Sequence, residues 1–316
     1  MQSSEILSIN GVSCLIPNKN GVDFFPYLED YFQRVTYANL EILIIDDGSE
    51  DSSFEAATAW ASRDSRVSLW RNIGSGLVDA LNFGIEKSRY EWIARFDVDD
   101  RYEVDRLTKQ LQVIDSGAIL VFSDFKFLLN EKYRSKTMPG PVSHLPTIIS
   151  FYSNRRTPHS SALFLKSAAI EAGLYKQSEY LAEDLGLWLR ISKIGKIESV
   201  PLTLIDYRVS QQSLLSQNRK TSVRVRNAVR DKEDFVGSAR LATQKLRETR
   251  DLYKNFPFSH LRYVLHVIEL LEIFVRERRL KFTFALLIRV LPTLGYKHYG
   301  SIIYIFYLRR KKNTSH

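Results

Sequence analysis

Three acidic residues end an apolar run near the middle of the chain. Residues 92–100 read Trp-Ile-Ala-Arg-Phe-Asp-Val-Asp-Asp, so a buried strand would deliver Asp97 and Asp99 to the edge of a sheet. Carboxylates held this close repel each other, and a divalent cation that also binds phosphate groups would relieve the repulsion. A solvated acidic turn or a helix cap explains the same residues, because aspartate favours both. The run alone leaves the metal site and the turn as equal alternatives.

The composition describes a globular protein with a sizeable core. The chain has 316 residues, of which 44% are hydrophobic, enough for one large α/β domain and an appendage. Its one cysteine, Cys14, excludes an internal disulfide framework and a cysteine-based zinc site, and its apolar surroundings predict a buried thiol. The first residues lack the features of a signal peptide, and no segment has the long uncharged stretch of a membrane-spanning helix.

The excess positive charge lies at the C-terminal end. Lysine and arginine number 45 against 36 acids, for a formal net charge of +9. Residues 276–316 hold ten of the basic residues and one acid, which leaves residues 1–275 neutral with 35 of each. A nucleic-acid-binding protein usually carries its charge across a folded face, so we expect no nucleic acid as partner. Short apolar stretches between the basic residues fit helices on an anionic membrane surface, and equally a helical subdomain that packs on the sheet.

Apolar runs and helical patterns alternate over roughly the first two hundred residues, which indicates an α/β fold with a mostly parallel sheet flanked by helices. We expect a first domain over 1–215 and a C-terminal helical region over 216–316. Strands are predicted at 12–16, 41–45, 67–70, 92–96, 118–122, 161–165 and 197–205. Helices are predicted near 23–35, 52–62, 75–88 and 103–115, and from residue 183.

Polar clusters follow four of the predicted strands. They are Pro17-Asn18-Lys19-Asn20, Asp46-Asp47-Gly48-Ser49, Asn72-Ile73-Gly74-Ser75-Gly76 and Asp97-Val98-Asp99. Ligands of parallel sheets bind at the C-terminal ends of the strands, and the third cluster precedes a helix whose backbone N–H groups can meet an anion. Each cluster alone is a weak signal, but their order and spacing are far more specific.

In this order the clusters resemble the inverting glycosyltransferases of family two, which have the nucleotide-sugar-binding GT-A fold. The resemblance spans roughly residues 11–213 and is closest to the enzymes that build bacterial surface polysaccharides. It implies a GT-A domain over 1–215. The matching segments are 14–20, 40–49, 72–84, 93–100, 106–110, 159–164, 182–190 and 207–210.

The resemblance implies roles for the matching positions. Asp47 would hydrogen-bond the base of the nucleotide, and Asp184 would be the catalytic base. Asp99 would ligate Mn²⁺ or Mg²⁺, with Asp97 at the ribose or the metal. The other residues expected around the nucleotide sugar are Pro17, Asn18, Asn20, Asn72, Gly74 and Arg208.

Three further residues are assigned to the acceptor region. His159 is placed there by the resemblance, although a lone histidine is more often structural. Glu183 beside Asp184 is explained as well by the preference of acids for a helix N-terminus. Trp188, one turn after Asp184, would wall the acceptor pocket or belong to the core.

Two residues of the acidic run itself have their own interpretation. Arg95 would pair with the aspartates or with the diphosphate of the donor, and a structural ion pair explains it equally well. Asp100 is interpreted as a helix-start residue only.

The expected chemistry agrees with these roles. Breaking a sugar–phosphate bond releases a nucleoside diphosphate, whose charge a divalent metal stabilises. The acceptor hydroxyl is a poor nucleophile, so a carboxylate must take its proton during the attack, and one base with direct displacement inverts the anomeric configuration. The resemblance implies a nucleotide sugar as the donor, with UDP as the nucleotide. The resemblance and the charge of the tail together imply a glycan linked to polyprenyl diphosphate as the acceptor, reached from the cytoplasmic face of the membrane.

One position departs from the family pattern. Tyr-Arg-Val is usually followed by a histidine, and here the next residue is Ser210, a weaker metal ligand. Arg208 would then neutralise part of the diphosphate charge. Two alternatives stay open: a non-catalytic family member that binds a sugar nucleotide or a partner enzyme, and a phosphatase of the haloacid-dehalogenase type. The phosphatase would use the first aspartate as nucleophile, but no partner motifs for it follow.

Overall fold

The structure of the protein is a computed structural model. It describes residues 10–129, 135–141, 143–152, 157–209, 217–231, 241–242 and 244–255, with Tyr263, His266, Val267 and Leu270. These residues belong to two compact units, one within 1–140 and 157–232, the other within 141–156 and 233–316. The predicted boundary at residue 215, the predicted role of Ser210 and the basic tail lie outside the described residues.

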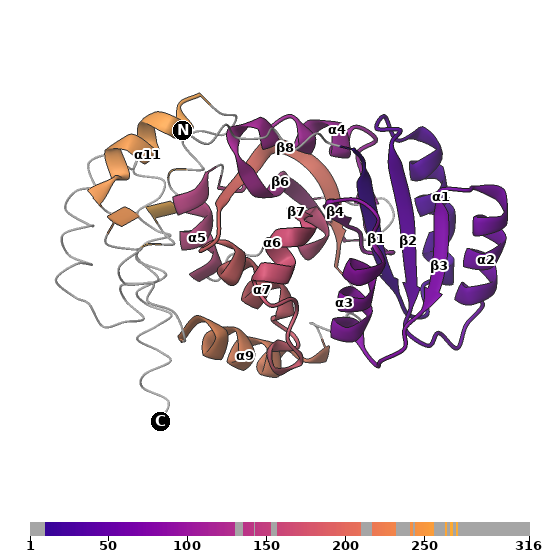
Figure 1. Cartoon of the computed structure of the whole chain (residues 1–316). Helices are drawn as coiled ribbons and strands as arrows, with labels where there is room; N and C mark the ends of the chain where they lie inside the picture. The colour runs from indigo at the N-terminus through magenta and orange to yellow at the C-terminus, as the bar shows by residue number, and fades with distance from the viewer. Residues whose placement is uncertain are drawn as a thin grey trace. The chain divides into compact units, whose positions relative to one another are not determined.

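The first unit is built on a mixed sheet of eight strands in the order β3-β2-β1-β4-β7-β6-β8-β5 (Figure 1). β1, β2, β3 and β4 run parallel, and so do β6 and β8. β7 is antiparallel to both β4 and β6, and β5 is antiparallel to β8. The strands are Val12–Asn18, Leu40–Asp46, Val67–Arg71, Trp92–Arg95, Arg101–Tyr102, Ala118–Leu128, Leu163–Leu165 and Lys196–Arg208, in the order β1 to β8.

Helices surround this sheet in the first unit. They are α1 (Phe25–Arg34), α2 (Ser53–Arg63), α3 (Leu77–Lys87), α4 (Arg106–Leu111), α6 (Lys166–Glu171), α7 (Glu183–Ile191) and α9 (Arg219–Asp231). Single 3-10 turns are η1 (Val22–Phe24), η2 (Ile114–Ser116), η3 (His159–Ser161) and η4 (Gln177–Glu179). The second unit contains α5 (His144–Tyr152) and α11 (Leu246–Tyr253). The α/β prediction is confirmed, and all seven predicted strands are present.

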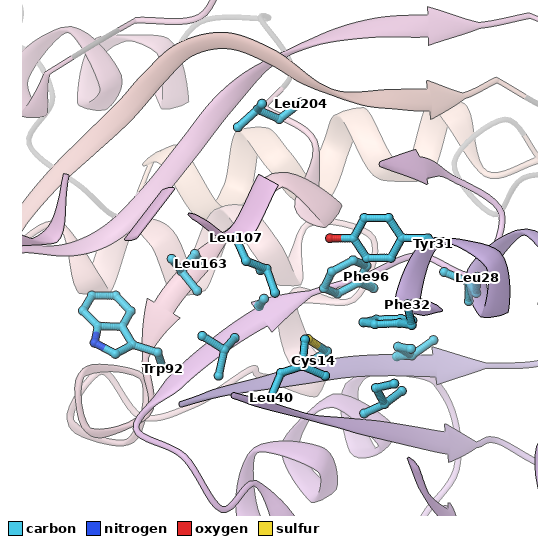
Figure 2. Close-up of a cluster of buried hydrophobic side chains, with 14 of the residues drawn as sticks. Cys14, Leu28, Tyr31, Phe32, Leu40, Trp92, Phe96, Leu107, Leu163 and Leu204 are labelled. Atoms are coloured by element: carbon cyan, nitrogen blue, oxygen red, sulfur yellow. The ribbon is translucent and has the colours of Figure 1, made fainter. Parts of the chain in front are cut away.

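The central strands are buried on both faces, which explains why they read as continuous apolar runs rather than alternating ones. Every residue of β1 is buried. Its alternate residues Val12, Cys14 and Ile16 belong to one core with apolar side chains of α1 and α2 (Figure 2). The predicted buried thiol of Cys14 is confirmed.

The opposite face of β1 lies against α3. A Cβ atom built on Gly84 of α3 would lie 2.1 Å from Leu15 Cδ1 and 3.2 Å from Ile45 Cγ1. No side chain fits at that distance, so glycine lets α3 approach the sheet closely. The loop before α3 is held near the sheet edge in this way.

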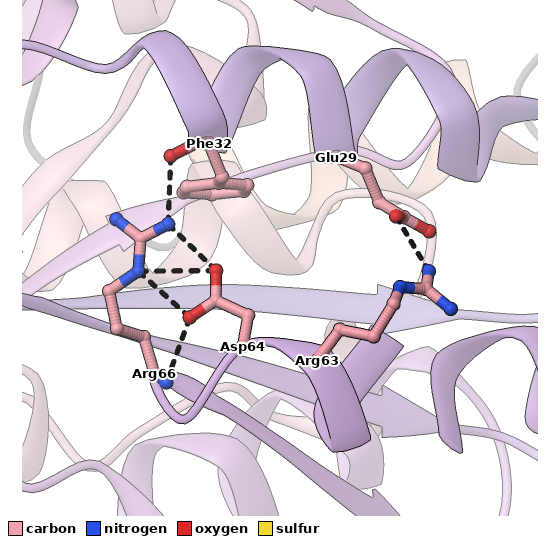
Figure 3. A network of polar contacts seen from close by, with 5 residues as sticks. All are labelled: Glu29, Phe32, Arg63, Asp64 and Arg66. Atoms are coloured by element: carbon pink, nitrogen blue, oxygen red, sulfur yellow. Dashed lines mark hydrogen bonds and ion pairs between the residues drawn. The ribbon is translucent and has the colours of Figure 1, made fainter. Parts of the chain in front are cut away.

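A small polar network joins α1 to the end of α2 (Figure 3). Arg66 Nη2 donates to the carbonyl of Phe32 (2.9 Å) and to Asp64 Oδ2 (2.7 Å). The Phe32 carbonyl belongs to the last turn of α1, where carbonyls lack partners within the helix, so Arg66 acts as its cap. Arg63 Nη2 also reaches Glu29 Oε2 (2.9 Å). The network fixes the two helices that cover one face of β1 and β2.

In the part of the chain that the structure describes, no helix has both the length and the apolar character needed to cross a bilayer.

Candidate active site

The first three parallel strands end side by side in residues that the sequence assigned to a nucleotide site. Asn18 closes β1 and Asp46 closes β2, and the two are in register. The N–H of Asp47 donates to the carbonyl of Asn18 (2.8 Å), and the N–H of Asn72 donates to that of Asp46 (2.8 Å). The loops that follow β1, β2 and β3 therefore form one continuous edge.

The first aspartate of Asp46-Asp47 organises the turn. Asp46 is 2% exposed and accepts from Asn18 Nδ2 (3.3 Å) and from the N–H of Ser49 (3.2 Å). Ser49 Oγ accepts in turn from Asn18 Nδ2 (3.1 Å) and from the N–H of Asn20 (3.0 Å). Asn20 Oδ1 accepts from the N–H of Glu50 (2.8 Å). Asn18 and Asn20 thus hold the β1 loop against the β2 loop. The sequence did not assign Ser49 a role here, although turn serines often bond nearby backbone groups.

The second aspartate faces the loop before α3. Asp47 Oδ1 accepts from Asn72 Nδ2 (2.7 Å) and from the N–H of Gly76 (2.9 Å). Asn72 Oδ1 accepts from the N–H of Gly74 (3.2 Å). Gly76 has φ +87°, a conformation that favours glycine. Asp47, Asn72 and Gly74, which the sequence assigned to one site, are therefore in one hydrogen-bonded group.

Pro17 lies buried within β1, in register with Ile45 of β2. The pairing of β1 with β4 ends at Leu15 and Arg95. The missing N–H of Pro17 therefore falls where β1 has no second strand to pair with, which is where a sheet tolerates proline.

The acidic run turns immediately after β4. Arg95, 2% exposed, donates through Nη2 to Asp97 Oδ1 at 2.7 Å, and the Asp97 side chain is 31% exposed. The hydroxyl of Tyr102 accepts from the N–H of Asp97 (2.7 Å) and donates to its carbonyl (2.9 Å). The carboxylate of Asp97 is thus fixed by a buried cation, and its backbone is fixed by β5. The structure therefore shows Arg95 in an ion pair with an aspartate, which is one of the interpretations drawn from the sequence.

Asp99 lies two residues further along the same turn. Arg208 Nε, at the end of β8, donates to the carbonyl of Asp99 (2.7 Å), and its guanidinium lies over the ring of Phe24 at 5.0 Å. Burial and the negative charge of Asp97 raise the pKa of Asp99 to about 6. Arg208 is therefore beside the acidic turn, but part of its hydrogen-bonding capacity holds that turn together.

The interpretation of Asp100 as a helix start is wrong. Asp100 is 3% exposed and accepts from Ser160 Oγ (2.5 Å) and from the N–H of Arg208 (2.7 Å). The next helix, α4, begins only at Arg106. Burial and the charges of Asp97 and Asp99 raise the pKa of Asp100 well above its usual range. Asp100 ties the acidic turn to β8 and η3.

The side chains of Asp97 and Asp99 fit a divalent cation. Burial and the nearby charge of Asp97 raise the pKa of Asp99, and a cation would favour its ionised form. Mg²⁺ and similar ions commonly take one or two protein carboxylates and complete their shell with substrate phosphates and water. Over the described ranges no group of three or more His, Cys, Asp or Glu side chains could hold a metal alone. An ion bound by Asp97 and Asp99 would need further ligands, such as phosphate groups or water.

A buried network beneath the turn was not assigned a role from the sequence. Arg106 Nη2 donates to the carbonyls of Arg95 (3.0 Å) and Ala162 (3.3 Å), and its Nε donates to Gln110 Oε1 (3.0 Å). Gln110 Nε2 donates to the carbonyl of Ser161 (2.8 Å). The signal was present as Arg-Leu-Thr-Lys-Gln, whose first and last residues share one face of a helix. This network fixes β4 to the segment that enters β7.

The acid pair opens α7 as predicted. Glu183 and Asp184 are 7% and 9% exposed, and Asp184 Oδ1 accepts from the N–H of Leu185 (2.7 Å). Glu183 Oε2 is buried without a hydrogen-bond partner among the described residues. Burial and the charge of Asp184 raise the pKa of Glu183 to about 7. On α9, Arg226 Nη2 lies 3.4 Å from Asp184 Oδ1, a contact that the sequence did not reveal.

His159 and Trp188 pack against each other, and Trp188 lies on α7 one turn after Asp184. His159 Nε2 is 2.8 Å from the hydroxyl of Tyr175, and its ring lies 5.7 Å from that of Trp188. Trp188 is 1% exposed and packs also on Phe122 and Phe164, which favours the core alternative for it. Burial and the charge of Arg95 hold the pKa of His159 well below its usual range, so the ring is neutral at pH 7.

Tyr175 connects the two acidic groups electrostatically. Burial and the charges of Asp184, Glu183 and Asp97 raise its pKa well above the usual range, against the opposing charge of Arg95. The acidic turn after β4 and the acid pair of α7 are therefore near enough to influence the same side chain. Tyr175 was not identified from the sequence, because nothing near it in the chain marks it.

Comparison with known proteins identifies the family of the chain. Residues 13–171 match the model of Glycosyl transferase family 2. The amylovoran biosynthesis glycosyltransferase AmsE of Erwinia amylovora is 31% identical over 188 residues, which are 57% of this chain and 68% of that protein. The chain spans a smaller share, 34%, of the length of other curated relatives.

Two solved structures share the fold. TarS from S. aureus in complex with UDP-GlcNAc has a TM-score of 0.58 at 11% identity, over 83% of this chain and 81% of that one. The mannosyltransferase PcManGT from Pyrobaculum calidifontis, in complex with GDP-Man and Mn²⁺, has a TM-score of 0.52 at 14% identity, over 90% and 83%. The predicted GT-A fold is confirmed. With half of its length matched by the family model and its polar clusters at the ends of the parallel strands, the chain belongs to glycosyltransferase family 2.

Proposed function

We propose that this glycosyltransferase is metal-dependent and inverting, and that it transfers a sugar from a nucleoside-diphosphate donor to a hydroxyl of a growing or lipid-linked surface polysaccharide. The observation that carries the proposal is the placement of two separate acidic groups in one unit, at the exit of β4 and at the start of α7. Transfer needs one group at the leaving diphosphate and another at the attacking hydroxyl. Family membership decides against the phosphatase alternative.

The donor would lie along the edge formed by β1, β2 and β3. Asp47 would accept a hydrogen bond from the base, beside Pro17, and the loop from Asn72 to Gly74 would contact the rest of the nucleotide. Asp97 and Asp99 would hold Mn²⁺ or Mg²⁺, which when bound supplies Lewis-acid stabilisation of the diphosphate charge. Arg208 would add positive charge on the same side.

The acceptor would meet the start of α7. Asp184 would take the proton of the acceptor hydroxyl as that oxygen attacks the anomeric carbon, and a single displacement inverts the configuration. Glu183 and neutral His159 would line this side, and Trp188 would support it from the core.

The comparisons support the choice of substrates. UDP-GlcNAc is bound by TarS, GDP-Man and Mn²⁺ are bound by PcManGT, and AmsE is named for amylovoran biosynthesis. UDP is our proposed nucleotide, and a polyprenyl-diphosphate-linked glycan is our proposed acceptor.

A screen of nucleotide sugars by thermal unfolding, with and without Mn²⁺, tests the donor side. One class of donor should raise the midpoint by roughly 5 to 10 °C at a hundredfold excess over its dissociation constant, because ligand binding stabilises the folded state by mass action. The shift should shrink when EDTA replaces Mn²⁺. No shift with any donor would contradict the proposal. Binding without transfer to any acceptor would favour the alternative, a non-catalytic binding protein, to which Ser210 points.

We also propose that the enzyme is cytoplasmic and associates with the inner face of the cell membrane through the basic residues of 276–316. Attraction to anionic lipid contributes about 1 kcal/mol per basic residue near the surface. Full-length protein should sediment with anionic vesicles at low salt and not with neutral ones. A variant that ends near residue 276 should stay in the supernatant, and equal sedimentation of the two would refute the role of the tail.

A further inference from the structure

One basic side chain of α9 lies against the proposed catalytic base. Arg226 Nη2 is 3.4 Å from Asp184 Oδ1 and 3.5 Å from Oδ2, and the two side chains are 22% and 12% exposed. One turn earlier on α9, Ser222 Oγ donates to the carbonyl of Leu181 at 3.1 Å, just before α7 begins. The ion pair therefore joins two anchored helices at a largely buried position, where it is screened less than a surface pair.

The pair of acids at the start of α7 needs such a cation. Glu183 and Asp184 are adjacent and nearly buried, and two carboxylates in that setting do not both ionise at low cost. Their surroundings are unequal. Asp184 has the N–H of Leu185 and the guanidinium of Arg226, whereas Glu183 Oε2 has no partner among the described residues. Arg226 contacts Asp184 directly, whereas burial and the charge of Asp184 raise the pKa of Glu183 to about 7.

We propose that Arg226 is a positioning residue that pairs with the carboxylate of Asp184 and holds it in place, so that Asp184 rather than Glu183 takes the proton of the acceptor. The inference rests on the proposed function, in which Asp184 is the base. Arg226 acts through Asp184 and takes no part in bond making.

The other ionisable groups around the pair do not replace this cation. In η4, Glu179 is paired with Arg190 of α7 at 2.7 Å, so its charge is already balanced. Burial raises the pKa values of Tyr175 and Tyr180 and lowers that of His159, so these three side chains are neutral at pH 7. Within the described part of the chain, no cation other than Arg226 contacts Asp184.

Carboxyl-carbon NMR of the full chain, without substrate, tests the inference directly. The Asp184 resonance is identified by its loss in Asp184→Asn, and it is titrated in a Glu183→Gln background, where one site titrates alone. Arg226→Gln should raise the midpoint of Asp184 by about one pH unit, because an opposite charge at this distance favours the carboxylate. Arg226→Lys should preserve most of the wild-type midpoint. Arg224→Gln, on the exposed side of the same helix, is the matched control and should leave it unchanged.

An unchanged midpoint in folded Arg226→Gln would overturn the proposal, and so would an equal shift in Arg224→Gln. If Arg226→Gln does not fold, the wild-type protein still tests whether Arg226 and Asp184 interact. Its Arg226 Nε resonance, assigned through Arg226→Lys, should shift with pH at the midpoint of the Asp184 carboxyl. Separate midpoints would mean that the two groups are not coupled.

Transfer assays with the donor identified by thermal unfolding distinguish this inference from the proposed function. If Asp184→Asn transfers sugar as well as the wild type, the proposed function fails. If Asp184→Asn is inactive and Arg226→Gln moves the acidic limb of kcat/KM upward by about one pH unit, both stand. If Asp184→Asn is inactive and the limb does not move, only the role of Arg226 fails.

Discussion

Replacing Asp184 by asparagine is expected to lower kcat for sugar transfer by about 10²- to 10⁴-fold. The amide cannot accept the proton of the acceptor hydroxyl, and it is nearly the same size as the carboxylate. The position opens α7 and is 9% exposed, so the substitution removes charge without creating a cavity. Donor binding, measured by thermal unfolding with nucleotide sugar and Mn²⁺, should stay unchanged, because the proposed donor site lies at the strand ends.

The matched control for Asp184→Asn is Glu171→Gln at the exposed end of α6, which removes an acid to which no role is assigned. Its kcat should equal that of the wild type. Equal transfer by Asp184→Asn and the wild type would refute Asp184 as the base. A loss of donor binding in Asp184→Asn would instead assign the residue to the donor side.

Replacing Asp99 by asparagine is expected to remove the metal dependence of donor binding. The variant should bind the nucleotide in Mn²⁺ only as weakly as the wild type binds it in EDTA, and kcat should fall by about 10²- to 10³-fold, as for other lost transition-state charge contacts. Isothermal titration with UDP, with and without Mn²⁺, measures the first effect. Unaltered Mn²⁺ dependence in Asp99→Asn would contradict the assignment.

Asp97→Asn provides the contrast, because Asp97 also holds a buried cation. Arg95 is 2% exposed, and its side chain forms an ion pair with Asp97 at 2.7 Å. Removing that charge should destabilise the fold by about 2 kcal/mol in urea unfolding, since a buried guanidinium loses its counter-ion. Asp99→Asn breaks no such pair and should leave stability in EDTA unchanged or higher. Equal destabilisation by the two variants would argue that both acids are structural.

The strand ends could be predicted because topology alone brings them together. Parallel strands put their C-terminal ends at one edge, so Asn18, Asp47 and Asn72 could be grouped from their positions after apolar runs. The structure shows hydrogen bonds from Asn72 to Asp47 and from Asp47 to Asn18. Nothing in the pattern separated Asp46 from Asp47, however, because both follow the same strand. Burial of Asp46 within the turn decides which of the two is structural.

The features that were missed depend on contacts between distant segments. Tyr102 lies in a strand of two residues, too short for any periodicity, yet its hydroxyl holds the backbone of Asp97. Asp100 was assigned to a helix start from its type alone, and its burial arises only from β8 and η3. Arg226 is 42 residues from Asp184 in the chain, in a stretch that reads only as a charged helix.

β7 is the antiparallel strand in the middle of the sheet, and its direction decides which segments lie beside the acidic turn. Because β7 runs against β4, the segment that enters β7 meets the segment that leaves β4, and the N–H of Arg95 donates to the carbonyl of Ala162 (2.9 Å). The proposed donor contacts therefore sit at strand exits, and His159 sits at a strand entrance. Substitutions just ahead of β7 would therefore reach the exit of β4, because Ser160 binds Asp100 of the acidic turn, whereas the exits of β1 to β3 make no such contact with this segment in the described residues. The topology thus couples the proposed acceptor side to the acidic turn, and it leaves the proposed nucleotide edge of β1 to β3 apart from both.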